Sequence, residues 1–333
     1  MSTLTQTDAD IVARLEAAGE RVQRAKKAAS AVVFGQERVI EQTLVTLLSG
    51  GHALLIGVPG LAKTLLVETL GRILGLDAKR IQFTPDLMPS DIIGSEVLED
   101  GGAGGKRGFR FIKGPIFAQL LMADEINRAS PKTQSALLQA MQEHHVTVAG
   151  QRHDTPAPFH VLATQNPLEQ EGTYPLPEAQ LDRFLLQIDV GYPDEIAERR
   201  MLFATTGTEE RRVETVLSAI ELMAMQRLVR QIPVPDKVVQ AILSLVRSAR
   251  PGEGASADIA RFVAWGPGPR ASQALMLAVR AKALIDGRLA PSVEDVAELA
   301  EPVLKHRMAL SFTARAEGRT ATEIIKDLSR AME

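Results

Sequence analysis

In the first 205 residues, short runs of apolar residues alternate with longer segments in which apolar residues recur at helical spacing. Apolar runs that predict buried strands cover residues 53–56, 80–83, 120–123, 159–167 (with a polar end) and 185–188. Apolar residues at helical spacing predict helices over residues 11–32, 37–48, 63–74 and 195–203. Strands that alternate with helices are typical of a parallel sheet covered on both faces. We therefore predict an α/β fold with a three-layer αβα core.

The pattern changes after residue 205. Residues 205–213 are polar and charged, which is typical of a linker. Helical spacing then continues over residues 218–229, 236–248, 257–263, 271–285 and 293–307, and no strand is predicted there. We predict two domains, an α/β core over residues 1–205 and a smaller all-α domain over residues 206–333.

Two segments interrupt the core pattern, at residues 87–115 and 144–154. Each has β-prone pieces around a turn, which predicts two inserted hairpins, although a disordered surface insertion stays an alternative for the first. We expect the glycine-rich tip at residues 101–105 to be mobile. The second hairpin carries His144, His145 and His153. No helical pairing or acidic ligand accompanies them, so we expect exposed histidines rather than a metal site.

Composition narrows the class of protein. The 333 residues include no cysteine, the net charge is −3, and no apolar run approaches the roughly 18 residues of a membrane span. The first ten residues are polar, unlike a secretory signal. We expect a soluble, cytoplasmic protein.

The loop between the first predicted strand and its helix carries the first candidate chemistry. It reads Gly57, Val58, Pro59, Gly60, Leu61, Ala62, Lys63, Thr64. A strand, a glycine-rich loop and a helix place backbone N–H groups and the helix dipole around one concavity, which favours phosphate. Lys63 would reach the terminal phosphates and Thr64 would bind Mg²⁺. Ala62 stands where glycine is common. An ordinary turn is the alternative, but a lysine at a helix N-terminus is unfavourable unless an anion accompanies it.

Polar residues end two later strands. Asp124 and Glu125 follow residues 120–123, and ligands gather beyond the carboxyl ends of parallel strands. Asp124 would therefore hold Mg²⁺ and Glu125 would polarise the attacking water; a helix-capping turn is the alternative. Asn166 would lie beside them if the two strands are neighbours, holding the water or the γ-phosphate. It could equally be a turn residue before Pro167.

Two arginines and one turn complete the set of candidates. Arg183 is either a surface partner of Asp182 or an arginine finger that reaches a neighbouring subunit. Arg270 occupies the first turn of a predicted helix, where only an anion would relieve its conflict with the dipole. The turn that contains Phe34 and Gln36 could lie against an adenine base, although periodicity alone favours packing between two helices.

Together these motifs resemble the MoxR family of AAA+ ATPases, a branch of the P-loop NTPases related to magnesium-chelatase motor subunits. The resemblance runs from about Val33 to the C-terminus and includes the alanine at position 62. It rests on residues 57–64, 124–129, 163–167, 178–184 and 269–270.

The resemblance implies a role for each candidate and a set of partners. The nucleotide ATP would be bound by residues from Gly57 to Leu65 with Phe34 and Gln36, and Mg²⁺ by Thr64 and Asp124. The catalytic residues would be Lys63, Glu125, Asn166 (sensor 1), Arg183 (arginine finger) and Arg270 (sensor 2, in an all-α lid domain). It also implies a hexameric ring, a client protein and a partner with a von Willebrand factor A domain. A finger that acts in trans requires a head-to-tail interface, which closes into a ring.

Two other functions compete with this one. A nucleic-acid motor or loader is disfavoured by the net charge of −3, the 4% aromatic content and the lack of an appended DNA-binding domain. A nucleotide-gated scaffold without turnover is disfavoured by the complete set of Glu125, Asn166 and Arg183.

Overall fold

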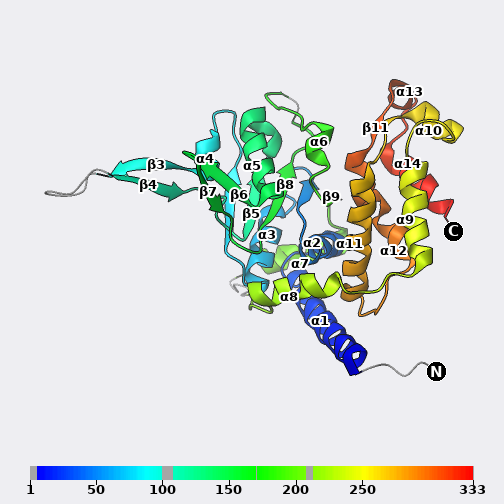
Figure 1. Cartoon of the computed structure of the whole chain (residues 1–333), viewed down its shortest axis with the longest axis horizontal. Coiled ribbons are helices and arrows are strands. Elements are labelled where there is room, and N and C mark those ends of the chain that lie inside the picture. The colour runs from blue at the N-terminus through cyan, green and yellow to red at the C-terminus, as the bar shows by residue number, and fades with distance from the viewer. Residues whose placement is uncertain (1–5, 100–107, 170, 208–212, 333) are drawn as a thin grey trace.

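A five-stranded parallel sheet forms the centre of the first half of the chain (Figure 1). The computed structural model describes residues 6–99, 108–169, 171–207 and 213–332. In the order β2-β5-β8-β1-β9, the sheet contains β1 (Ala53–Ile56), β2 (Ala78–Gln82), β5 (Leu120–Asp124), β8 (His160–Gln165) and β9 (Leu186–Asp189). The predicted parallel sheet is confirmed. The strand at residues 120–124 is the neighbour of the strand at residues 160–165, as the proposed site requires.

Alternate residues of each strand pack on opposite faces of this sheet. Ala53 and Leu55 belong to one apolar cluster, and Leu54 between them belongs to the other. The first face is covered by α1 (Gln6–Ser30), α2 (Glu37–Leu48) and α3 (Lys63–Ile73), and the second by α4 (Pro89–Ile93) and α5 (Pro131–Glu143). A sheet with two buried faces needs helices on both sides. The three-layer αβα core is therefore confirmed. The 3-10 turn η1 (Ile126–Arg128) and the helices α6 (Glu178–Leu181) and α7 (Glu195–Thr205) complete it.

Both inserted hairpins are present, and they contact each other. The first contains β3 (Gly94–Glu99) and β4 (Gly108–Lys113) and projects from the core (Figure 1); the second contains β6 (His145–Val148) and β7 (Gln151–Asp154). The predicted mobile tip at residues 101–105 lies outside the described residues. The expectation of an exposed His153 is wrong, because its half-buried ring stacks on Phe111 of the other hairpin at 4.0 Å. His145 is also half-buried, whereas His144 is exposed.

The second half of the chain is the helical lid. It contains α8 (Ala219–Val229), α9 (Asp236–Ser248), α10 (Ala257–Phe262), α11 (Pro269–Ile285), α12 (Val293–Leu304), the 3-10 turn η2 (Lys305–Arg307), α13 (Phe312–Ala316) and α14 (Ala321–Arg330). The expectation of no strand in this half is wrong at one place, where β10 (Val263–Trp265) pairs with β11 (Ala309–Leu310). These strands have three and two residues, which is too short for a period of two to show in the sequence.

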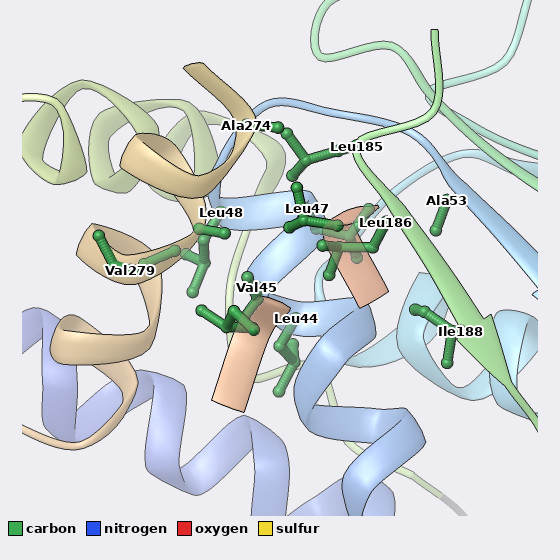
Figure 2. Close-up of a cluster of buried hydrophobic side chains, with 14 of the residues drawn as sticks. Leu44, Val45, Leu47, Leu48, Ala53, Leu185, Leu186, Ile188, Ala274 and Val279 are labelled. Carbon is green, nitrogen blue, oxygen red and sulfur yellow. The ribbon is translucent and has the colours of Figure 1, made fainter. Parts of the chain in front are cut away.

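Helix α2 lies between the sheet and the lid. Figure 2 shows Leu47 and Leu48 of this helix among side chains of β9 and of lid helix α11, including Leu186 and Val279. The same apolar cluster continues from α1 and α2 into the lid. Charges also cross here, because the Glu41 carboxylate of α2 pairs with Lys26 of α1 and with Lys282 of α11. A division of the chain at residue 205 therefore stays a prediction. No helix among the described residues combines the length and the apolar character that a bilayer span requires.

Candidate functional site

The glycine-rich loop connects the carboxyl end of β1 to the first turn of α3, as its sequence predicts. Gly57 is required by close approach, since a Cβ there would come within 2.7 Å of the Val190 carbonyl oxygen after β9. Gly60 is required by its backbone, which has φ +86° and open space around it. Ala62 has φ +56°, in the left-handed region that glycine prefers. The structure thus explains why glycine is common at position 62 and shows that alanine is accommodated there.

The Lys63 side chain folds back over this loop. Its ammonium donates to the carbonyl oxygens of Gly57 at 2.6 Å and Val58 at 2.9 Å. Burial lowers the pKa of Lys63 below its usual value, while the nearby charges of Asp124 and Glu125 act to raise it. The ammonium is therefore held at the mouth of the loop, where a phosphate would offer it better acceptors.

Asp124 and Glu125 end β5 on the same side of the sheet. The buried Asp124 carboxylate accepts from Arg80 Nη2 at 2.6 Å and from the Thr164 hydroxyl. Glu125 has φ +55°, and its backbone N–H donates to Thr164 Oγ1 at 2.9 Å. The Glu125 carboxylate accepts from Gln82 Nε2 at 2.7 Å and from Arg128 Nη1 at 3.2 Å. Both carboxylates are thus held by polar neighbours that a bound ligand would have to replace or join.

Asn166 follows β8 and is buried. Its side-chain oxygen accepts from the Leu168 backbone N–H at 3.1 Å, which is the turn role considered as the alternative. The same residue lines the cavity beside the two carboxylates. The turn role and the position in the site therefore occur together.

One cavity of about 460 Å³ brings most of the predicted site residues together. Its lining includes Pro59, Gly60, Leu61, Ala62, Lys63, Thr64, Leu65, Asp124, Glu125 and Asn166. Phe34 and Gln36 do not line it; Gln36 is buried and donates to the Gly191 carbonyl oxygen at 2.8 Å. The carboxylate of Asp124 and the hydroxyl of Thr64 are oxygen donors, which suit Mg²⁺. The cavity has the size and donor chemistry of a site for a phosphate-bearing ligand with a hard cation.

Three residues of this cavity were missed by the reading of the sequence, namely Arg80, Gln82 and Thr164. Arg80 and Gln82 lie two residues apart on β2, so both side chains point to the same face of the sheet. Gln82 is paired in register with Asp124 of β5. Polar residues with a period of two near a strand end are the signal that could have found them, once β2 is placed beside β5.

The two predicted arginines lie in a second cavity, of about 280 Å³. It is lined by Arg183 and Arg270, by residues 50–52 before β1, and by Asp182. Residues that precede β1 and β9 lie at the amino end of the sheet, because β1 and β9 run parallel with Ala53 opposite Leu186. The glycine-rich loop at residues 57–64, the P-loop, follows the carboxyl end of β1. Four residues of strand, roughly 13 Å, separate that edge of the sheet from the amino edge. Arg183 and Arg270 are therefore not brought to the P-loop of their own chain.

The alternative of an Arg183–Asp182 surface ion pair is wrong. The Asp182 carboxylate pairs instead with Arg307 at 2.7 Å and with Arg270 at 3.7 Å. Arg183 Nη1 donates to the carbonyl oxygen of Leu138 on α5. The lining of the cavity thus contains three arginines and one carboxylate, and its excess positive charge favours an anion.

Known proteins resemble this chain in sequence and in fold. Residues 52–186 match the family described as ATPase family associated with various cellular activities (AAA), and residues 255–328 match the AAA lid domain. Chaperone MoxR1 of Mycobacterium tuberculosis is 44% identical over 287 residues, covering 86% of this chain and 75% of the relative. Protein MoxR of Paracoccus denitrificans is 32% identical, covering 87% and 89% of the two chains. A crystal structure from Cytophaga hutchinsonii, assigned as a candidate ATPase, superposes with a TM-score of 0.88 at 36% identity, covering 98% and 97%.

Proposed function

Because the chain belongs to the MoxR family of AAA+ ATPases, we propose that this ATPase hydrolyses Mg-ATP at sites that two neighbouring subunits of a ring complete together. The P-loop cavity of one subunit binds the nucleotide, and Arg183 and Arg270 of the next subunit reach its phosphates. The assembly is a hexamer by family resemblance, and it works in the cytoplasm.

One observation supports this arrangement above all others, namely the position of the arginines at the opposite edge of the sheet. The P-loop lies at the carboxyl edge, and Arg183 and Arg270 line one cavity at the amino edge. A head-to-tail contact between two copies brings the amino edge of one against the carboxyl edge of the other. Such a contact generates a ring when its rotation closes. Both arginines then act in trans.

The P-loop edge binds and orients the substrate. Lys63 exchanges its hydrogen bonds to the two loop carbonyls for bonds to oxygens of the terminal phosphates. The backbone N–H groups of the loop also donate to these phosphates. Thr64 and Asp124 hold Mg²⁺. When bound, Mg²⁺ neutralises charge that develops on the phosphate oxygens.

Glu125 and Asn166 act on the attacking water. The Glu125 carboxylate orients the water by accepting its hydrogen bond and then takes its proton. The water oxygen bonds to the γ-phosphorus as the bond from this phosphorus to the β–γ bridging oxygen breaks, which releases ADP and phosphate. Gln82 and Arg128 donate to this carboxylate and orient it towards the water when ATP is bound. Asn166 holds the water or the γ-phosphate beside it. Arg183 and Arg270 of the neighbour then stabilise the charge of the transition state, which an arginine in trans does by about 10³–10⁵-fold.

The β3–β4 hairpin is the surface by which the ring contacts a client protein. It projects from the core (Figure 1), and four of its apolar side chains are exposed. They are Val97, Leu98, Phe109 and Ile112. Hydrolysis remodels or matures this client, in cooperation with a partner that contains a von Willebrand factor A domain, as family resemblance implies.

Glu125→Gln tests the assignment of the base. We expect the variant to bind ATP with the wild-type Kd and to lose about 10²–10⁴-fold of its steady-state turnover, because an amide cannot accept the proton. Glu68→Gln, which changes an exposed carboxylate on the P-loop helix, is the matched control and should keep full turnover. Turnover of Glu125→Gln at the wild-type rate would show that Glu125 is not the base. Because the variant holds ATP, it should also retain clients and partners in a pull-down.

A further inference from the structure

Arg307 lines the same cavity as the two proposed trans arginines, Arg183 and Arg270, and has no role in the function described so far. It belongs to η2 of the lid, and its side chain is only 2% exposed. A buried guanidinium is costly unless its N–H groups are bonded, so the partners of Arg307 show what its burial holds in place.

The bonds of Arg307 converge on the segment that carries Arg183. Its Nε donates to Asp182 Oδ1 at 2.7 Å, its Nη2 to the Phe184 carbonyl oxygen at 2.6 Å, and its Nη1 to the Leu185 carbonyl oxygen at 3.1 Å. Three residues of the core, Asp182, Phe184 and Leu185, are thus bonded by one side chain from a lid element 122 to 125 residues away in sequence. The planar, rigid fork of a guanidinium suits this task better than a lysine ammonium.

Asp182 extends the same connection to Arg270. Its Oδ1 is held by Arg307, and its Oδ2 lies 3.7 Å from Arg270 Nη1 at the start of α11. Arg183 is the next residue in the chain and is anchored separately to the Leu138 carbonyl oxygen. One carboxylate therefore relates the positions of an arginine on the core and an arginine on the lid.

We propose that Arg307 and Asp182 form a positioning pair, which sets Arg183 and Arg270 at the spacing at which both reach the phosphates bound by the neighbouring subunit. This inference rests on the proposed function. The pair touches no substrate and acts through the two arginines. It makes the donated half of the site a single rigid unit built from core and lid.

Mixed rings test the pair, because they separate the arginines that a subunit donates from the nucleotide site that it owns. Asp182→Asn keeps the shape and a side-chain oxygen for Arg307, but it removes the charge that holds Arg270. We expect kcat to fall about tenfold to a hundredfold, as displaced catalytic groups produce, and the KM for ATP to stay within about twofold. Arg307→Lys should show the same pattern, and Asp182→Asn carries the test if the lysine variant does not fold.

The decisive measurement adds an excess of Glu125→Gln subunits before the rings assemble. These subunits do not hydrolyse ATP but donate intact arginines. We expect them to restore turnover to the Asp182→Asn sites, to the level that they restore to Arg183→Ala sites. Arg288→Lys, at a lid arginine that pairs with Asp286 and Asp295, is the matched control and should keep the wild-type kcat.

Two results would overturn the positioning role. One is an Asp182→Asn variant with the wild-type kcat. The other is a slow variant that Glu125→Gln subunits fail to restore while they do restore Arg183→Ala, since the defect would then lie in the variant's own site. Failure to restore Arg183→Ala itself would instead refute the trans arrangement on which the inference rests.

Discussion

The two edges of the central sheet carry charge in different ways. At the carboxyl edge, two cations and two carboxylates line the P-loop cavity and bond to one another or to nearby backbone: Arg80 with Asp124, and Lys63 with the loop carbonyls. At the amino edge, three arginines and one carboxylate, Asp182, line the second cavity, and two of these arginines pair with it. Arg80 is half exposed, whereas Arg307 is almost fully buried. The first edge is balanced in charge, and the second has an excess of positive charge and contains a buried, fully bonded arginine.

This difference follows from what each edge has to do. A site that admits a ligand needs contacts that can be exchanged, and half-exposed ion pairs are weak enough for that. A surface that presents two arginines to another subunit needs a fixed geometry, which buried and fully bonded groups supply. The difference predicts that substitutions of the arginines and their partners at the amino edge affect turnover or stability strongly. Apart from the residues that act on the substrate, such as Glu125, substitutions of the exchangeable contacts at the carboxyl edge should have smaller, ligand-dependent effects.

Arg183→Ala should have the largest effect. We expect kcat to fall about 10³–10⁵-fold, because the transition state loses an arginine donated in trans, while ATP affinity stays unchanged. Steady-state ATPase measurements and equilibrium nucleotide binding check the two halves of this prediction. Arg199→Ala, at an exposed arginine on α7, is the control. A raised KM with an intact kcat would break the comparison, since it would place Arg183 in ground-state binding.

Acid should have the next largest effect, because it should lower the stability of the fold through two histidines at the amino edge of the sheet. His52 precedes β1 and His160 begins β8, and both are fully buried. His52 Nδ1 accepts from the Val161 N–H, and His160 Nε2 lies 3.0 Å from the Gln226 amide nitrogen, so both rings are held neutral. Burial lowers the pKa of His52 to about 3 and that of His160 to about 4.

The sign of the pH effect follows from these depressed values. Below the ordinary pKa of 6.5, the unfolded chain takes up protons that the folded chain does not. The contribution of these two histidines to the free energy of unfolding is therefore fully present above about pH 6.5. It falls towards pH 4, by roughly 1.4 kcal/mol per pH unit for each histidine. Urea unfolding at several pH values measures this slope. His160→Gln should reduce the slope even if it lowers stability.

The local motifs were predictable from sequence because their chemistry is contiguous. The strand, loop and helix around Lys63 occupy a single short stretch, and Asp124 follows directly from its strand. Asn166 needed one further assumption, that β5 and β8 are neighbours, and the sheet order bears this out.

The rest depended on distances that no local pattern contains. Arg80 enters the site only because β2 is the edge neighbour of β5. Asp182 and Arg307 meet across 125 residues of sequence. His153 looked exposed because its partner, Phe111, belongs to a different hairpin. In each case the sequence identified the residue type, and the packing of separate elements decided its partner.

Ala62→Gly sharpens the comparison at the carboxyl edge. Ala62 has φ +56°, which costs an L-residue about 1–2 kcal/mol, and glycine removes this strain but adds entropy to the unfolded chain. We expect a net gain of roughly 0.5–1 kcal/mol in the free energy of unfolding. Ala149→Gly, at φ +49° in the second hairpin, is the control and should show a similar gain. A loss of stability for Ala62→Gly alone would mean that the Ala62 methyl group makes contacts worth more than the strain.

Arg80→Gln should have the smallest effect, and it tests whether the pairing at the carboxyl edge is exchangeable. Arg80 and Mg²⁺ would compete for the Asp124 carboxylate, so removal of the arginine should lower the Mg²⁺ concentration that half-saturates ATPase activity. A half-exposed ion pair of about 0.2–1 kcal/mol corresponds to a shift of about one-and-a-half to fivefold. Arg152→Gln removes a more exposed pair with Asp154 on the second hairpin, away from the site, and should leave the Mg²⁺ dependence unchanged. If Arg80→Gln raised the Mg²⁺ requirement instead, Arg80 would support the occupied site rather than compete for it, and the contacts of the carboxyl edge would be as fixed as those of the amino edge.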